Sequence, residues 1–153
     1  MSLTFIEYAS PEAYKVHYEE NYCSKPVLTF DGIRVFFSKD KFSHAFFESS
    51  DRRGSKDVFS EDRAKRIDWI KETLESKEAQ MFQGWDAKNR CYFPDGRVSV
   101  VYENFVVIIK ISLTRNGDLK GNFMTCYQAD NSIGKIKASP IWDKDKCMEK
   151  LQK

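Results

Sequence analysis

The chain has 153 residues, of which 41% are hydrophobic and 31% charged, and its formal net charge is +2. This length suits one domain with a single hydrophobic core, and this composition excludes a disordered chain. The charge is too balanced to indicate a nucleic-acid partner by itself, so only local clusters of basic residues can argue for one.

The first predicted element is a helix that begins at Ser10 and Pro11 and runs to about Tyr22. Serine is a good helix cap, and proline suits the first helical position. His17 lies in this helix among charged residues and is expected at the surface.

A small hairpin follows the first helix. Asp31 and Gly32 join two short apolar runs, residues 27–30 and 33–37, in a pattern typical of a β-hairpin.

A second helix is predicted over residues 42–50, where Phe42, Ala45 and Phe46 have helical spacing. His44 lies off the centre of that apolar face, so we expect it at the rim, where it could meet solvent or substrate. A polar loop over residues 49–60 follows, with basic residues from Arg52 onward.

Ser60 begins the third predicted helix, because it is a capping residue followed by two acids. Ile67, Ile70 and Leu74 form its core face. Arg63 and Arg66 lie on one side of this helix. A row of charged residues on a helix usually faces solvent and has no further function.

From residue 81 the hydrophobic pattern changes to period two, which predicts strands. The main strands are expected over residues 81–85, 97–102, 105–113 and 119–127, with turns at 94–96 and 116–117. In the last strand, Phe123, Thr125 and Tyr127 are predicted on one face, with Met124 and Cys126 on the other. After residue 130 the pattern is weak.

Helices and a small hairpin followed by a four-stranded antiparallel sheet predict an α+β fold, with residues 1–153 as a single domain. The longest apolar run, residues 105–109, is far below the ~20 residues that span a bilayer. No secretory signal is visible, so we expect a cytoplasmic protein with no membrane partner. Four widely spaced cysteines without a CxxC pair indicate neither a zinc site nor a disulfide framework.

The sequence has no phosphate-binding glycine loop, nucleophile elbow or HExxH motif. The remaining chemistry is metal-free and uses His, Lys, Arg, Tyr and Thr, with no cofactor. RNA can be cut in this way, because its own 2′-OH attacks the adjacent phosphate and the protein supplies a base, an acid and cations. A paired-carboxylate hydrolase stays open, although no pair of acids stands out.

Three short motifs carry a family resemblance. They are Phe42-Ser43-His44-Ala45-Phe46, then Lys56 and Arg63-Ala64-Lys65-Arg66-Ile67-Asp68-Trp69-Ile70, and finally Thr125-Cys126-Tyr127. In this order they resemble the phage barnase–EndoU–colicin–RelE-like (PBECR) nucleases, small α+β RNase domains that act as toxins or phage effectors. The resemblance covers approximately residues 27–130, the nuclease-like core.

The resemblance implies a metal-independent endoribonuclease that acts on messenger or transfer RNA, with a possible antitoxin or immunity protein as partner. By position, the implied catalytic residues are His44, Lys56, Arg66, Thr125 and Tyr127. The implied RNA-binding residues are Arg52, Arg53 and Arg63.

Each of these residues also has a purely structural interpretation. His44 could be a packing residue, Lys56 a plain loop lysine, and Thr125 and Tyr127 ordinary strand formers. The alternative function is a non-catalytic module on a degenerate nuclease fold that binds RNA or a partner protein. A third possibility is a structural phage or mobile-element protein on the same fold.

Overall fold

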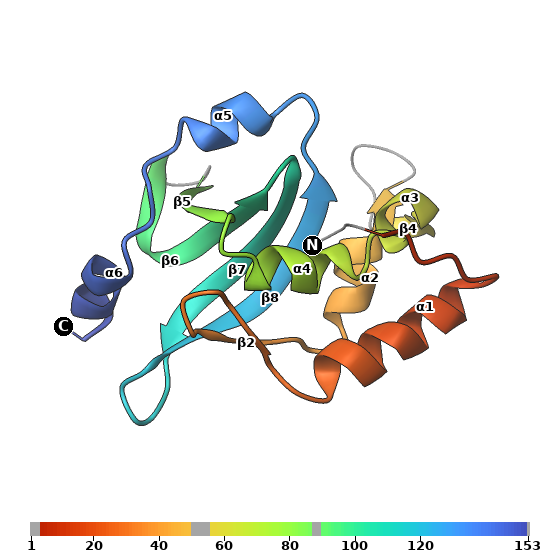
Figure 1. Ribbon diagram of the computed structural model, residues 1–153, viewed down its shortest axis with the longest axis horizontal. Helices are drawn as coiled ribbons and strands as arrows, with labels where there is room; N and C mark the ends of the chain where they lie inside the picture. The colour runs from red at the N-terminus through yellow and green to blue at the C-terminus, as the bar shows by residue number, and fades with distance from the viewer. Residues whose placement is uncertain (1–3, 50–55, 87–89, 153) are drawn as a thin grey trace.

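The computed structural model describes residues 4–49, 56–86 and 90–152; for residues 49, 56, 57, 86 and 93–95 it describes the backbone alone (Figure 1). Within this part of the chain, α-helices and a mixed β-sheet form one α+β structure. The α+β class predicted from the sequence is therefore confirmed.

The main sheet contains six strands within the described residues, in the order β1-β2-β8-β7-β6-β5. The strands are β1 (Val27–Leu28), β2 (Arg34–Phe36), β5 (Gln80–Asp86), β6 (Cys91–Tyr102), β7 (Phe105–Leu113) and β8 (Leu119–Gln128). Neighbours from β5 to β8 are antiparallel, whereas β2 joins β8 in parallel. The sheet is thus larger than the predicted four strands, because the hairpin at Asp31 and Gly32 adds β1 and β2 to the β8 edge.

The first predicted helix has its predicted extent, whereas the second and third are shorter or divided. The first is α1 (Pro11–Tyr18), which continues as one turn of π-helix, η1 (Glu19–Cys23). The second, α2 (Lys41–Phe46), ends four residues early. Strand β3 (Phe47–Ser49) follows it and pairs with β4 (Lys56–Phe59) in a separate two-stranded sheet.

The third predicted helix is divided into α3 (Glu61–Ala64) and α4 (Trp69–Glu75). Its predicted cap is present, because the Arg63 backbone N–H donates to the Ser60 hydroxyl oxygen at 3.2 Å. The chain ends with α5 (Ile133–Lys137) and α6 (Lys144–Leu151). In the described ranges, no helix combines the length and the apolar character that crossing a bilayer requires.

The main core lies on one face of the sheet, between the strands and helices α1, α2, α3 and α4. Figure 1 shows α1, α2 and α3 gathered toward β8, and α6 toward the β6 end of the sheet. Cys147 of α6 is buried in the same main core. Val98, Val107, Ile109 and Phe123 point into this core and are buried. The opposite face carries Arg97, Ser99 and other polar side chains. One face of the sheet therefore packs in the core, and the other presents polar groups.

A β-bulge in β8 corrects the predicted faces of this strand. Ile108 pairs with Thr125 but Ile109 pairs with Phe123, so Met124 is an extra residue. One extra residue reverses the alternation of side chains. Phe123 therefore lies in the main core beside Cys126, whereas Met124, Thr125 and Tyr127 lie on the polar face.

Candidate active site

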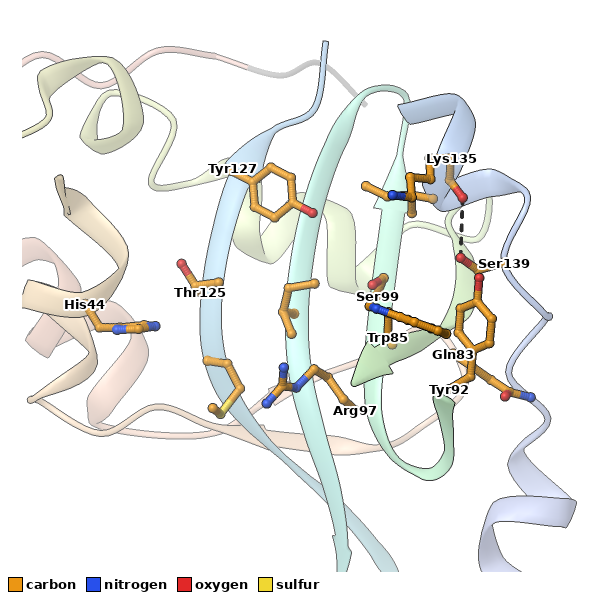
Figure 2. Close-up of a pocket in the computed structure, with 14 residues that line it drawn as sticks. His44, Gln83, Trp85, Tyr92, Arg97, Ser99, Thr125, Tyr127, Lys135 and Ser139 are labelled. Atoms are coloured by element: carbon orange, nitrogen blue, oxygen red, sulfur yellow. Dashed lines mark hydrogen bonds between the residues drawn. The ribbon is translucent and has the colours of Figure 1, made fainter. Parts of the chain in front are cut away.

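A cavity of about 680 Å³ lies on the polar face of the sheet. Strands β5 to β8 form its floor, α2 contributes one wall and α5 contributes another (Figure 2). Among the described residues that line the cavity, three have basic side chains and none has a carboxylate. The basic residues are His44, Arg97 and Lys135. The cavity therefore favours an anionic ligand.

His44 reaches this cavity from α2. The helix is fixed in rotation because Phe42, Ala45 and Phe46 are buried in the main core. His44 lies off that buried face, and its imidazole points from α2 toward Thr125 on β8 (Figure 2). The predicted rim position agrees with this placement.

Thr125 and Tyr127 present their hydroxyl groups to the same cavity from β8. The Thr125 Oγ1 atom is buried, and within the described part of the chain it has no hydrogen-bond partner. Such a group is usually satisfied, so the Thr125 hydroxyl is available to a bound ligand. Burial raises the pKa of the Tyr127 phenol, while the positive charge of Arg63 partly opposes this shift.

Two cationic residues of the cavity were not among the predicted site residues. Arg97 lies on β6, directly opposite Lys110 of β7, and directly opposed residues share a face. Arg97 lines the cavity, and a guanidinium can bind an anion through two hydrogen bonds. The period-two pattern of Arg97, Val98 and Ser99 could have placed Arg97 on the polar face.

Lys135 comes from α5, in the segment where the sequence pattern is weak. Ile133 and Ile136 of this helix pack on a second, smaller apolar cluster that contains Val106 and Phe82. This packing holds α5 over one end of the polar face and places Lys135 at the cavity. The contact joins segments far apart in sequence, so local pattern offers no signal for it.

Gly84 provides the space in which the stem of Arg97 lies. A Cβ atom at position 84 would lie 2.7 Å from the Arg97 Cγ atom and 2.9 Å from its Cβ atom. The pairing of β5 and β6 is irregular between Gln83 and Gly84, which brings the two residues together.

The Gly84→Ala substitution is therefore expected to displace Arg97 and to weaken the binding of an anion in the cavity by about tenfold, the usual effect of losing one hydrogen bond to a charged group. Overpacking of this kind also costs about 1–3 kcal/mol of stability. The measurement is the affinity for inorganic phosphate together with the free energy of unfolding. Gly134 is a matched control, because a Cβ there meets nothing within 4 Å; equal affinities of the two alanine variants would contradict the proposed packing role.

Arg63 and Arg66 do not line the main cavity. They lie in a smaller neighbouring cavity of about 210 Å³ that shares Tyr127 with the main one. This smaller cavity also contains carboxylates, including Glu48 and Asp62. Its charge is therefore balanced, which makes it a poorer site for an anion than the main cavity.

Arg66 is engaged by neighbouring groups. Its Nη1 atom lies 3.0 Å from the Asp62 carboxylate, and its guanidinium lies over the rings of Phe5 and Trp69. The hydrogen bond from Arg66 is the main cause of the lowered pKa of Asp62. Through these contacts Arg66 holds the N-terminal segment against the rest of the fold. It does so outside the cavity that His44 lines.

Arg63 connects the smaller cavity to α2, the helix that carries His44. Its guanidinium lies 3.3 Å from the Glu48 carboxylate and donates to the Ala45 carbonyl at 3.4 Å. Because Ala45 follows His44 in α2, Arg63 helps to hold the end of that helix. These contacts make Arg63 a positioning residue for α2, and its role in RNA binding stays a prediction.

Three other predicted residues cannot be placed at the site. Arg52 and Arg53 lie outside the described residues, and the Lys56 side chain does too, although its backbone begins β4. In the described ranges, no three His, Cys, Asp or Glu side chains come close enough together to hold a metal ion.

His17 is not a plain surface residue, which corrects the sequence prediction. Its side chain is only 13% exposed, and its Nε2 atom lies 2.7 Å from Asp68. Its Nδ1 atom lies 2.9 Å from the Tyr8 hydroxyl. The hydrophobic pattern gave no sign of this contact, because Asp68 is far away in sequence.

Comparison with known proteins found no matching family model, no matching curated protein and no matching solved structure. The resemblance to PBECR nucleases therefore stays a prediction, and the site must be interpreted from its own geometry.

Proposed function

We propose that this chain is a metal-independent endoribonuclease with its active site in the main cavity. The observation that carries the proposal is the convergence of His44, Thr125, Tyr127, Arg97 and Lys135 on that cavity. An imidazole, two hydroxyl groups and two cations are the groups that RNA cleavage by 2′-OH attack requires.

In the proposed reaction, His44 acts as general base and takes the proton from the 2′-OH. The 2′ oxygen then bonds to the adjacent phosphorus, and the bond from phosphorus to the 5′ oxygen breaks. Tyr127 donates a proton to the departing 5′ oxygen, since a phenol is more acidic than an alcohol. The products are a 2′,3′-cyclic phosphate and a 5′-hydroxyl.

The remaining groups stabilise the negative charge that develops on the phosphate. Arg97 and Lys135 supply positive charge within the cavity, and arginine matches phosphate oxygens well. The Thr125 hydroxyl, which has no hydrogen-bond partner within the described chain, supplies a donor. RNA brings its own nucleophile, so no serine or cysteine is needed.

The finer features of the proposal follow the family resemblance. The antiparallel run β5 to β8, preceded by helices, supports a barnase/EndoU/colicin/RelE-like core. On this basis we propose messenger or transfer RNA as the substrate, a cytoplasmic site of action and an antitoxin or immunity protein as partner.

Cleavage of a defined single-stranded RNA in the presence of EDTA tests the proposal. We expect fragments that end in a 2′,3′-cyclic phosphate and begin with a 5′-hydroxyl. A single 2′-deoxy substitution on the 5′ side of a cut should abolish that cut alone. Intact RNA, with binding retained, would instead establish the non-catalytic RNA-binding module.

The pH dependence of cleavage tests the role of Tyr127. Its phenol acts in the protonated form, and burial raises its pKa above the usual value of about 10. Loss of the proton therefore begins only above that value, and the contribution of Tyr127 should persist as the pH rises to 9. The measurement is kcat/KM from pH 6 to 9 for the wild type and Tyr127→Phe. A fall in activity below pH 9 that disappears in Tyr127→Phe would contradict this assignment.

A further inference from the structure

Two aromatic side chains lie at the end of the main cavity opposite His44. Trp85 of β5 is 50% exposed although it is a large apolar residue. Its ring meets that of Tyr92 of β6 edge to face, with centroids 5.1 Å apart and planes at 69°. Both residues line the cavity (Figure 2), and the proposed cleavage step uses neither.

The edge-to-face contact fixes the Trp85 ring without covering it. Aromatic pairs favour this geometry, so Tyr92 supports Trp85 from one side. An exposed, supported indole ring offers a flat surface, and nucleobases stack on such surfaces with little dependence on their identity.

The position of the pair suits a strand of RNA. His44 lies beside β8, whereas Trp85 lies on β5, three strand spacings away, which is roughly 14 Å. Arg97 of β6 lies between these two ends of the cavity, where a phosphate backbone would cross. A base on Trp85 would therefore belong to a different nucleotide from the one cleaved at His44.

We propose that Trp85 and Tyr92 form a nucleobase-stacking subsite for single-stranded RNA, at least one nucleotide from the scissile phosphate. This inference rests on the proposed function and specifies its substrate: an unpaired strand whose flanking base is held by stacking. Paired RNA would present its backbone and not the face of a base.

Binding of a fully 2′-O-methylated RNA hexanucleotide tests the subsite, because methylation removes the attacking hydroxyl. Titration should quench tryptophan fluorescence in the wild type. Quenching should persist in Trp69→Phe, since Trp69 does not line the main cavity. It should disappear in Trp85→Phe, while Trp85→Ala should weaken binding about tenfold, as measured by anisotropy of a labelled hexanucleotide.

Kinetics separate this subsite from the catalytic proposal. Trp85→Ala should raise KM for single-stranded RNA about tenfold and change kcat less than twofold. Unchanged binding and unchanged KM in Trp85→Ala would overturn the subsite while leaving the endoribonuclease proposal intact; Trp85 would then be free for a protein contact. Equal quenching by an abasic oligonucleotide would also overturn it. Stacking without any cleavage by the wild type would retain the subsite and refute the catalytic function.

Discussion

Replacing His44 with alanine is expected to lower the rate of RNA cleavage by 10²- to 10⁴-fold, the usual contribution of a general acid–base group. Among the described residues that line the cavity, His44 is the only histidine. Histidine commonly titrates near neutral pH, so no other lining side chain replaces it as a base. The measurement is single-turnover cleavage at saturating enzyme, which separates the chemical step from binding.

The variant should remain folded and should still bind RNA. His44 is exposed and lies off the buried face of α2, so its loss removes little packing. Ser43→Ala is a matched control, because Ser43 is the adjacent exposed residue of α2 and does not line the main cavity. It should cleave within twofold of the wild type. Added imidazole should restore part of the activity of His44→Ala alone.

A wild-type cleavage rate in His44→Ala would refute the assigned base. An equal loss of cleavage and of binding to a 2′-O-methylated RNA would instead indicate that His44 only holds the substrate.

Most strands were predictable because their side chains alternate locally, but the turn predicted at residues 94–96 was wrong, since this segment lies within β6. The apolar run of β7 was expected over residues 105–113 and is observed as Phe105–Leu113. The turn at Gly32, whose φ is +87°, was predicted because glycine adopts this conformation without steric cost. The parallel pairing of β2 with β8 was not predictable, since it joins residues about 85 positions apart that carry no local signal.

The site was predictable only where a local rule decides the direction of a side chain. Thr125 and Tyr127 are two residues apart and share a face, as period two requires. The predicted face of Phe123 was wrong, because the bulge at Met124 depends on the pairing of β8 with β7. The position of Arg66 outside the main cavity has another cause: Asp62, Phe5 and Trp69 all contact its guanidinium, and only folding brings Phe5 there. Its catalytic role stays a prediction.

Arg97→Ala is expected to lower the rate of cleavage at saturating RNA by about 10²- to 10³-fold, as the loss of one charge-stabilising group usually does. Arg97→Lys should recover only part of this loss, because lysine keeps the charge but lacks the planar fork that matches two phosphate oxygens.

Stability distinguishes this role from a structural one. Arg97 is exposed, so replacing it removes little buried surface, and its register partner Lys110 carries the same charge. The free energy of unfolding should therefore change by less than about 0.5 kcal/mol, as for an ordinary surface substitution.

Lys110→Ala is the matched control, because Lys110 is the register partner of Arg97 but does not line the cavity. It should remove one positive charge from the same face of the sheet without lowering the maximal rate. Equal losses of cleavage in the two alanine variants would show that RNA responds only to the total charge of this face. A loss of cleavage in Arg97→Ala alone would show that the negative charge of the transition state develops beside the Arg97 guanidinium. Arg97 lies on β6, the strand next to β5, which carries the exposed Trp85.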